Sequence, residues 1–577
     1  MIDRSLFGRV GRVVVSTAVN RSNPSSCCST LLQARTMMRD GQSQVLAKDA
    51  PQTPYEAAIL HLNSLQSNAI TIQKAREKRG MLQEANIPKT IANLSQCGIE
   101  LDDIDRLNVI HVSGTKGKGS TCAFVESILR KAGFRTGLYT SPHLVHARER
   151  IRINGFPISE TLFAKHFFTV YNRLKKVCGI FLIHFRSVSH RSEKKYKTQP
   201  KKKIGTTNHT PYVIGLTVFM FFKVFQDEHT EGMPPYFKFL TLLSFHVFLR
   251  ECVDVAIVEV GIGGEFDCTN VVQHPVVCGI STLDIDHTSL LGSTLPDIAW
   301  HKAGIIKSGS PTIASPAPSE ALEVMVNRGL ERGIELKLAP PYESYSFSAG
   351  CVSAGIAGDH QKINISLALQ LARTWLKQMG REALVFPDTL ENEWHPGEPF
   401  HVPPAVVEAL ESCRWRGRSQ IVDAGRIRYY LDGAHTPKSM EMCSLWFDDA
   451  ARKSPKVKRV LIFQCTADRK PSTLLPYLVK HSFDYALFCP TALKVSLDLK
   501  SDLTNINQSV KDQELRSQLC ASTWKGTGTG EVLTFDCITS TVEWVQLLAA
   551  TETLDVLVTG SLHLVGGVLS IVEPCED

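Results

Sequence analysis

No run of apolar residues in this sequence reaches the ~18 that a membrane-spanning helix needs. The nearest, residues 211–225, is shorter and has no polar face. The 577-residue chain also lacks a basic stripe interleaved with aromatic residues, and its net charge is only +7. The missing basic stripe argues against nucleic acid as a partner. A peripheral membrane association remains possible in principle, but no spanning segment supports it. With 43% hydrophobic residues, the chain is typical of a globular protein of two or more domains.

Cysteine spacing gives no sign of a zinc site or a disulfide framework. The 16 cysteines are scattered, and although Cys27 and Cys28 adjoin, no CxxC pair or Cys/His spacing suitable for zinc occurs. This usage is typical of thiols in a reducing compartment, most of them in the core.

The first forty residues contain only two acidic residues, Asp3 and Asp40, but are rich in arginine and serine. That composition is typical of a mitochondrial transit peptide. We therefore predict that residues 1–42 direct the protein to the mitochondrion, to the matrix or the inner membrane face. A disordered N-terminus is the alternative. Translation from Met37 or Met38 would give a second, cytoplasmic form.

Apolar, β-branched runs alternate with helical patterns between about residues 55 and 400. Continuous apolar strands separated by helices indicate a parallel sheet that is covered on both faces. Asn154-Gly155, between alternating residues, predicts a hairpin turn. The candidate strands of this region are 107–113, 135–140, 253–260 and 276–283.

The alternation resumes after residues 384–413, a stretch rich in Pro, Glu and Trp that we interpret as a linker because it lacks clear periodicity. The strand candidates beyond it are RYYLDGA, KRVLIFQC, DYALFCP and DVLVTGS. We therefore predict a parallel-sheet domain over residues 52–400 and a smaller α/β domain over residues 401–577.

Residues 178–232 interrupt this order with a basic run at 191–203 and the apolar run at 211–225. We find no chemistry in either run, and a basic run is usually a solvated or disordered segment. Loop closure costs only roughly 0.6 kcal/mol for each doubling of length, so a fold tolerates such an excursion. We expect this segment to be an insert that comes from retained intron sequence or a gene-model error.

The segment GTKGKGS, residues 114–120, lies between a short apolar run and a helical pattern that ends at Gly133. Glycines in such a loop let backbone N–H groups point at phosphate oxygens, and the following helix adds its positive end. Lys118 would meet the β- and γ-phosphates, with Ser120 or Thr121 at the metal or phosphate. The serine comes two residues after the lysine, unlike the common GxxxxGK[ST] loop. A tight turn without a ligand is the alternative.

Polar side chains follow two further apolar strands. Glu259 closes one strand, and Asp284, Asp286 and His287 follow the next. Ligands gather where the carboxyl ends of parallel strands meet. A buried glutamate is costly unless it is paired or metal-bound, so Glu259 indicates either a structural Arg or Lys partner or a metal. Carboxylate, imidazole and hydroxyl groups suit Mg²⁺ when a nucleotide supplies the other ligands.

A third strand closes with Ser141, Pro142 and His143. A Ser-Pro-His corner alone is weak evidence of a site. Because three strands end in Ser141, Glu259 and His287, and parallel strands converge on one rim, we expect these three side chains to lie together.

Nine segments occur together in one order: GTKGKGS, YTSPHL, VEVGIGGEFDCTN, DIDHTSLLG, AWHKAGIIK, GDHQKIN, RGRSQ, YYLDGAHT and VTGSLHLVGG. As a set they resemble the folylpolyglutamate synthases of animal mitochondria and cytosol, in the Mur ligase superfamily. The resemblance covers about residues 52–575 apart from the insert. It implies an α/β fold, with a P-loop parallel-sheet ATPase domain followed by a smaller Rossmann-like α/β C-terminal domain that belongs to the glutamate ligases.

The resemblance implies ATP-dependent addition of L-glutamate to the γ-carboxylate of tetrahydrofolate and its polyglutamates, through an acyl phosphate. Phosphoryl transfer needs positioning and charge neutralisation more than a nucleophilic side chain. By resemblance, six residues hold ATP: Gly117, Lys118, Gly119, Ser120, Arg418 and Asp432. Three residues coordinate Mg²⁺: Ser141, Glu259 and His287. A monovalent cation can accompany them.

Lys302 matches the lysine that relatives carry as a carbamate, a negatively charged metal ligand. Without that modification, Lys302 would be one more cation beside Mg²⁺ and would repel it. The resemblance assigns three residues to catalysis: Lys118, His287 and Lys302.

His435 and Ser439 lie shortly after Asp432 and are expected to meet the substrate glutamate. Capping of the following helix is the alternative. His360 and Asn364, one helical turn apart, match a family motif whose role the sequence does not define.

Two other functions are alternatives. A dihydrofolate synthase would add the first glutamate to dihydropteroate. The leader-like N-terminus and the animal-like residues of the motifs favour a folylpolyglutamate synthase instead. A nucleotide-binding protein without ligase activity would not need all of Glu259, His287, Arg418 and Asp432. The expected partners are tetrahydrofolates and L-glutamate, and a monomer is expected because no assembly signal is visible.

Overall fold

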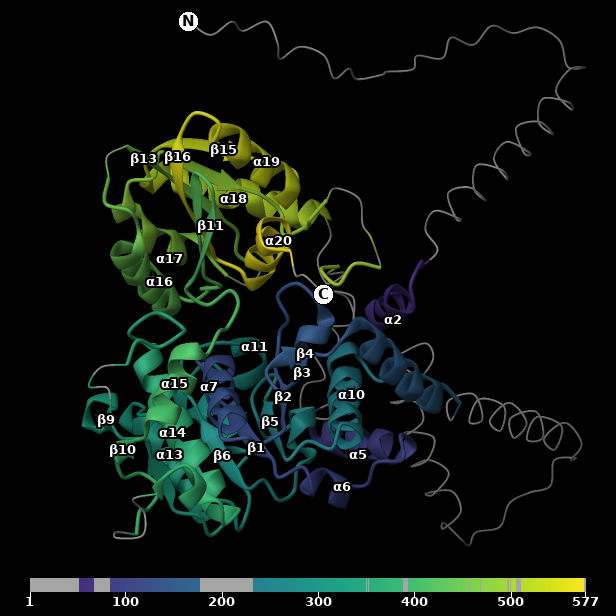
Figure 1. The fold of residues 1–577 in the computed structure, drawn as a ribbon. Coiled ribbons are helices and arrows are strands. Elements are labelled where there is room, and N and C mark those ends of the chain that lie inside the picture. The colour runs from purple at the N-terminus through teal and green to yellow at the C-terminus, as the bar shows by residue number, and fades with distance from the viewer. Residues whose placement is uncertain are drawn as a thin grey trace, which may run out of the picture. The chain divides into compact units, whose positions relative to one another are not determined.

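Two α/β sheets with helices on both faces account for most of the described part of the chain (Figure 1). The computed structural model describes residues 51–66, 83–176 and 232–574, with short gaps at 349, 351, 388–392, 455, 467–468, 495–497, 499 and 505–509. Thr53–Asp577 is one compact unit. The predictions of a transit peptide at 1–42, of starts at Met37 and Met38, and of an insert at 178–232 lie outside the described residues, except for residue 232.

The first sheet has the order β4-β3-β2-β5-β1-β6-β7-β8. Its strands are β1 (Ile110–Ser113), β2 (Thr136–Tyr139), β3 (Ile151–Ile153), β4 (Phe156–Pro157), β5 (Val255–Glu259), β6 (Val277–Ile280), β7 (Thr312–Ala314) and β8 (Leu336–Leu338). All are parallel except β3 and β4, whose hairpin turns at Asn154 and Gly155 with positive φ at both. The four strands and the hairpin predicted here are confirmed, whereas β7 and β8 were not predicted.

Alternate residues of the central strands enter different cores, which explains their continuous apolar runs. Val255 and Ile257 pack on the side of α7 (Lys118–Lys131) and α14 (Gln361–Gln378). Ala256 and Val258 pack on the side of α10 (Tyr236–Arg250). Further helices of this region are α2 (Pro54–Asn63), α5 (Asn86–Gln96), α6 (Leu101–Asp105), α11 (Thr288–Leu291), α12 (Leu295–Ala303) and α13 (Ser319–Leu330), and the described residues 160–176 are helical as well.

The linker predicted at 384–413 is wrong in its C-terminal part. Residues 404–412 form α15 (Pro404–Ser412), which follows the two-stranded pairing of β9 (Ser346–Phe347) with β10 (His401–Val402). Val406, Val407 and Leu410 bury one face of α15 in the same core as α7. Adjacent prolines hide this short helix in the sequence, although proline is well tolerated in a first helical turn. The change from the first core to the second therefore falls between α15 and Gln420, later than the boundary predicted at 401.

The second sheet has the order β11-β12-β16-β13-β14-β15, with β11 antiparallel and the others parallel. Its strands are β11 (Gln420–Ala424), β12 (Ile427–Leu431), β13 (Val457–Phe463), β14 (Tyr485–Phe488), β15 (Glu531–Thr534) and β16 (Thr553–Thr559). Its helices are α16 (Pro437–Ala450), α17 (Pro471–Leu474), α18 (Val510–Thr527), α19 (Ile538–Leu548) and α20 (Leu562–Val572). The four predicted strands are confirmed. The edge strands β11 and β15 escaped prediction because each contains only two or three apolar residues, most of which are not buried.

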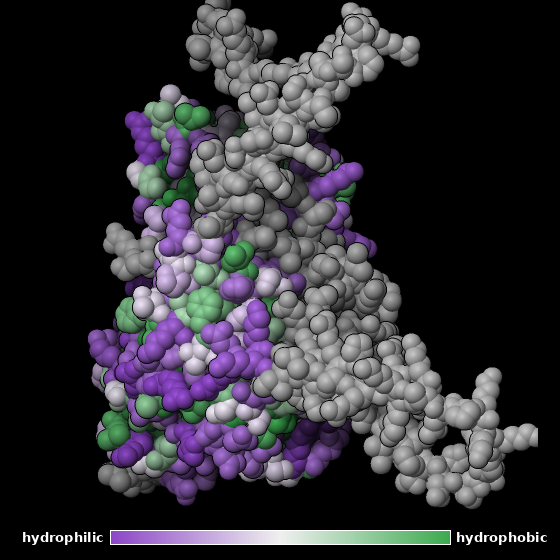
Figure 2. Space-filling view, turned by 90° about the vertical axis from the view of Figure 1, so that its right-hand side faces the viewer, coloured by the Kyte–Doolittle hydropathy of each residue, from purple (hydrophilic) through white to green (hydrophobic). Residues whose placement is uncertain are grey.

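Every cysteine that the structure describes is a free thiol, as predicted, and all of these except Cys252 are buried. Within the described ranges, no helix combines the length and apolarity required to cross a membrane. On the face that Figure 2 shows, apolar residues lie scattered among hydrophilic ones.

Buried histidines are expected to make the folded protein sensitive to acid. Burial lowers the pKa of His111 to about 3 and those of His246 and His481 to about 4. The unfolded chain therefore binds more protons between about pH 4 and 6.5, so the free energy of unfolding falls as the pH falls through this window. Urea unfolding is expected to show a lower midpoint at about pH 5.5 than at about pH 7.5. His246→Gln should reduce the difference between the urea midpoints at the two pH values. Equal midpoints at the two pH values in the parent protein would contradict the prediction.

Candidate active site

The glycine-rich loop after β1 has a backbone that favours glycine at two positions. The φ angle is +138° at Gly114 and +83° at Gly117. A Cβ at Gly114 would lie 1.9 Å from Ser281 Oγ, and a Cβ at Gly117 would lie 2.0 Å from Asn364 Oδ1. Helix α7 begins at Lys118 with no side chain capping its first amides. These N–H groups can therefore receive an anion, which is the geometry that a phosphate needs.

Backbone contacts fix this loop against the segment that follows β6. The amides of Thr115 and Lys116 both donate to Thr282 O, each at 3.0 Å. The hydroxyl of Thr121, in the first turn of α7, is buried without a hydrogen-bond partner among the described residues. Thr121 is fully buried, and the cavity beside the loop is lined by its neighbour Ser120.

Glu259 lies at the end of β5 beside the loop and is 4% exposed. Its Oε1 lies 3.9 Å from Lys118 Nζ, and its Oε2 accepts a hydrogen bond from Ser141 N at 2.9 Å. Burial raises the pKa of Glu259, while Lys118 and the Ser141 amide oppose this shift. Because the nearest cation stays beyond hydrogen-bond distance, the carboxylate retains lone pairs for a ligand.

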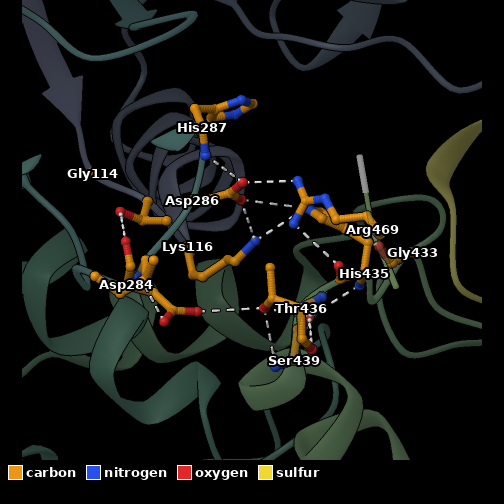
Figure 3. A network of polar contacts seen from close by, with 12 residues as sticks. Gly114, Lys116, Asp284, Asp286, His287, Gly433, His435, Thr436, Ser439 and Arg469 are labelled. Atoms are coloured by element: carbon orange, nitrogen blue, oxygen red, sulfur yellow. Dashed lines mark hydrogen bonds and ion pairs between the residues drawn. The ribbon is translucent and has the colours of Figure 1, made fainter. Parts of the chain in front are cut away.

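Asp286 connects the two sheet domains through a network of charges (Figure 3). Its Oδ2 lies 2.9 Å from Lys116 Nζ of the glycine-rich loop, and its Oδ1 lies 2.7 Å from Arg469 Nη2, which follows β13. His435 Nε2 lies 3.0 Å from Lys116 Nζ, and His435 O accepts from Arg469 Nη1 at 3.2 Å. Asp286 is 6% exposed. Burial alone would raise its pKa, but His435 and Lys116 hold the pKa of Asp286 well below its usual range.

His287 follows in the chain with φ +52°, and its N–H donates to Asp286 Oδ1 at 2.8 Å. Partial burial lowers the pKa of His287 to about 4; Asp286 opposes this shift, and the charges of Lys118 and Lys302 add to it. The imidazole is therefore neutral at physiological pH, which is the form that binds metals.

The second domain contributes Arg418 and Asp432. Asp432 Oδ2 accepts from Ser419 N at 2.8 Å, and its Oδ1 accepts from Ala434 N at 2.9 Å. Burial lowers the pKa of Arg418, while Asp432 and Glu259 oppose the shift. The Arg418 guanidinium thus interacts with a carboxylate of its own domain and with one of the other domain.

A cavity of about 1100 Å³ brings most of the predicted site residues together. Its lining includes Gly117, Lys118, Gly119, Ser120, Ser141, Glu259, His287, Arg418, Asp432, His435 and Ser439. Lys302 is not part of the lining. It lies behind the glycine-rich loop, 3% exposed, and its Nζ donates to Gly114 O at 2.7 Å. Lys118 and Arg418, from different domains, therefore face one cavity.

Ser439 has the capping role that the sequence left as an alternative. Its Oγ accepts from Thr436 N at 2.9 Å and from His435 N at 3.0 Å, in a capping box at the start of α16. Ser439 and His435 nevertheless line the cavity as well, so the cap also fixes the part of the chain that carries the His435 side chain.

The structure gives positions to residues whose roles the sequence left undefined. Asn364, at the start of α14, packs against Gly117 of the loop. His360 lines the same cavity as Arg418 and Asp432 of the second domain. Burial lowers the pKa of His360, the charge of Asp432 opposes this shift, and the charge of Arg418 adds to it. Arg469 was not predicted, although it follows an apolar parallel strand, β13, just as Glu259 closes β5. The rule about carboxyl ends of strands could have found it.

The glycine-rich loop of one α/β domain lines one cavity together with an arginine and an aspartate of a second α/β domain. This arrangement is that of a two-domain ATP-dependent ligase. Solved structures agree on the fold. A Mycobacterium tuberculosis folylpolyglutamate synthase complexed with ADP has a TM-score of 0.60 and 19% identity, covering 90% of this chain and 100% of that one. Escherichia coli FolC in complex with DHPP and ADP has a TM-score of 0.58 and 21% identity, covering 91% and 99%.

Sequence comparisons name the family. A model for the C-terminal domain of dihydrofolate synthetase matches residues 418–571. A Caenorhabditis elegans relative is 43% identical over 94% of this chain and 97% of its own. The mitochondrial folylpolyglutamate synthases of Bos taurus and Homo sapiens are each 36% identical, over 94% and 93% of this chain and 96% and 94% of theirs. The chain belongs to the folylpolyglutamate synthase family, the enzymes that add glutamate to folates using ATP.

Proposed function

We propose that this enzyme joins L-glutamate to the γ-carboxylate of tetrahydrofolate and of its polyglutamates. The observation that carries the proposal is the cavity that Lys118 and Glu259 of one domain share with Arg418 and Asp432 of the other. A γ-carboxylate oxygen attacks the γ-phosphorus of ATP, the bond to ADP breaks, and an acyl phosphate forms. The amine of glutamate then attacks the acyl carbon and displaces phosphate. Closure around the acyl phosphate excludes water, which would hydrolyse it.

The proposed roles follow from charge and position. The amides of Gly117, Gly119 and Ser120 hold phosphate oxygens, and Lys118 neutralises the charge that the transferred phosphoryl group carries. Arg418 approaches the nucleotide from the second domain, since a guanidinium can donate two hydrogen bonds to a phosphate. Asp432 accepts hydrogen bonds from the ribose or the base.

Mg²⁺ fits the residues at the strand ends. Ser141, Glu259 and His287 offer a hydroxyl, a carboxylate and an imidazole, and Glu259 keeps lone pairs unused by the protein. Within the described residues, no group of three or more His, Cys, Asp or Glu side chains is close enough to hold a metal by itself. Oxygens of ATP and water would therefore complete the coordination, as is usual for Mg²⁺. When bound, the ion neutralises phosphate charge, and a monovalent cation can share this task.

A carbamate on Lys302 is part of the proposal. The unmodified ammonium is buried beside Lys118, an unfavourable place for a second cation next to a metal. Lys302→Ala is expected to lose at least about 100-fold in kcat, and short carboxylic acids or bicarbonate should restore part of the rate by replacing the carbamate. The rate is measured as glutamate-dependent ADP release. A loss that neither additive mends would leave the carbamate unsupported.

His435 and Ser439 are proposed to contact the incoming glutamate. Both line the cavity, and His435 Nε2 lies 3.0 Å from Lys116 Nζ of the glycine-rich loop. A carboxylate entering here would meet Lys116 and Arg469 as well, two cations that Asp286 holds in place.

The experiment that tests the function is a ligation assay on the purified chain with ATP, Mg²⁺, labelled glutamate and tetrahydrofolate, with and without residues 178–232. The expected result is a labelled polyglutamate product and one ADP for each glutamate added. Dihydropteroate as acceptor tests dihydrofolate synthase activity, the second candidate, which the family model over residues 418–571 favours. ATP binding without glutamate-dependent ADP release would instead indicate a non-catalytic nucleotide-binding protein.

We further propose a mitochondrial location, as the names of the Bos taurus and Homo sapiens relatives state for those proteins. A cytoplasmic form would start at Met37 or Met38, and the enzyme would act as a monomer. Fractionation of cells that express tagged versions with Met1 or with both Met37 and Met38 substituted would test the two forms.

A further inference from the structure

Residues 141–150 connect β2 to β3 in the first domain, and both ends of this segment line the cavity, through Ser141 and Arg150. We call this segment the coupling loop. Its middle belongs to the core of the second domain, because Leu144 and Val145 pack among the side chains of β12, β16 and α20. A Cβ on Gly566 of α20 would lie 1.9 Å from Leu144 O. This approach explains why glycine is required in the middle of that helix.

A second part of the C-terminal domain holds the same loop. Asp502 lies in the connection between β14 and α18, and its side chain is 11% exposed. Its Oδ1 accepts from Ala147 N of the coupling loop at 2.6 Å and from the Tyr55 hydroxyl at 2.7 Å. Its backbone O lies 3.1 Å from His143 Nε2. The second domain therefore contacts the coupling loop at two separate places, through the core around Leu144 and Val145 and through Asp502.

The hydrogen bonds of His143 fix its tautomer. Arg150 Nε can only donate, so His143 Nδ1, at 2.9 Å, accepts. His143 Nε2 then carries the proton and donates to Asp502 O. The imidazole thus links a backbone carbonyl of the second domain to a guanidinium of the first. Glu149 supports the arrangement, since its carboxylate accepts from the N–H groups of Leu144, Val145 and His146 at 3.0 to 3.2 Å.

Arg150 is a buried cation that faces the cavity. It is 8% exposed, and its guanidinium carbon lies 5.4 Å from the centroid of the Tyr236 ring. Among the described residues, no carboxylate lies within ion-pair distance of it, and its Nε is already used by His143. A buried guanidinium without a carboxylate partner is costly unless a bound anion neutralises its charge. The two terminal nitrogens of Arg150 are therefore available to an anionic ligand in the cavity.

We infer that Arg150 binds an oxyanion of the reacting substrates, and that the second domain, through Asp502 and His143, sets the position of its guanidinium. This inference rests on the proposed ligase function. Arg150 contacts substrate, whereas His143 and Asp502 are positioning residues. Engagement of the second domain on the coupling loop thereby places Arg150 at the cavity, so that the oxyanion site is complete only when both domains hold the loop.

The test compares His143→Ala, His143→Gln, Arg150→Ala and Asp502→Ala with the parent enzyme. The control is Asp449→Ala, which removes an exposed aspartate from α16 of the same domain. His143→Ala and Asp502→Ala are expected to lower kcat/KM by about 10- to 100-fold, since a misplaced binding group costs rates of this order. His143→Gln, which keeps a donor and an acceptor, should recover part of the loss. Asp449→Ala should behave as the parent.

Separate KM values for ATP and tetrahydrofolate identify the oxyanion. A rise confined to ATP assigns Arg150 to a phosphate, and a rise confined to tetrahydrofolate assigns it to the carboxylate; either result supports the inference. An Arg150→Ala enzyme with both KM values and kcat unchanged would overturn the oxyanion site. A His143→Ala enzyme equal to the parent, or one whose loss is matched by a lower unfolding temperature and is not recovered by glutamine, would overturn the positioning role.

Binding titrations distinguish a failure of this inference from a failure of the proposed ligase function. Binding of tetrahydrofolate and of AMPPCP, a non-hydrolysable ATP analogue, needs no turnover. If the parent enzyme bound both but failed to ligate glutamate, the proposed function would fail. Weaker binding of one of the two by Arg150→Ala and His143→Ala would still support the inference, and unchanged binding of both would refute it.

Discussion

Replacing Lys118 by alanine is expected to lower kcat for glutamate ligation by about 10³-fold or more, because cations that neutralise a transferred phosphoryl group carry effects of this size. Lys118 is the first residue of α7, lines the cavity, and lies 3.9 Å from Glu259. Its ammonium is therefore placed where the phosphates would meet the free amides of the helix. The measurement is single-turnover ADP formation with saturating ATP and tetrahydrofolate.

The matched control for this variant is Lys131→Ala, in the last turn of the same helix. Lys131 is partly exposed and pairs with Glu408 on the surface, 2.7 Å away. Its loss should leave kcat within about twofold and cost less than about 1 kcal/mol of stability. A Lys118→Ala enzyme that retained more than a tenth of the parent rate would contradict the assigned role.

Replacing Asp286 by asparagine is expected to lower the free energy of unfolding by about 3 kcal/mol and kcat/KM for glutamate by about 100-fold. The change preserves size but leaves Lys116, Arg469 and His435 clustered without their carboxylate. Lys116 and Arg469 belong to different domains, so the repulsion between these two cations acts on the contact between the domains as well as on the cavity. Urea unfolding and steady-state kinetics measure the two effects.

Asp284→Asn is the matched control. Asp284 lies two residues away and, within the described residues, its side chain makes one weaker contact across the same boundary, from Thr436 Oγ1 at 3.3 Å. It should cost less than about 1 kcal/mol. Equal effects of the two substitutions would show that the loss comes from disturbing the segment after β6 rather than from the buried charge.

The centre of both sheets and the rim of the cavity were predictable from the sequence. A strand buried on both faces reads as a continuous apolar run, and such runs revealed β1, β2, β5 and β6. Because parallel strands share a carboxyl edge, the polar residues that follow them could be grouped in advance. Glu259, Ser141 and the glycine-rich loop were found in this way.

The contacts between the domains were not predictable, because they depend on distant parts of the chain meeting. Arg469 meets Asp286 only when the second sheet faces the first. In the sequence, His143 was only weak evidence of a functional site, because its partners Arg150 and Asp502 belong to different domains. Gly566 reads as a destabilising residue within α20 until Leu144 O is known to approach it.

Short helices and edge strands were also missed by the sequence-based prediction, because their apolar patterns are brief. The helix α15 spans few turns and begins with adjacent prolines, so its apolar face is too brief to stand out from the surrounding Pro- and Trp-rich sequence. The edge strand β15 has only two apolar residues, Val532 and Leu533, and both are half-buried, so its apolar run is too short to stand out.

The most direct test of the central claim, that both domains hold one ATP, is the dissociation constant of AMPPCP for Arg418→Ala, measured by calorimetric titration against the parent protein. Arg418 belongs to the second domain, and losing a guanidinium that donates to a phosphate is expected to weaken binding by about 10- to 100-fold at unchanged one-to-one stoichiometry. An affinity equal to that of the parent would mean that the first domain binds the nucleotide alone, and would contradict the claim.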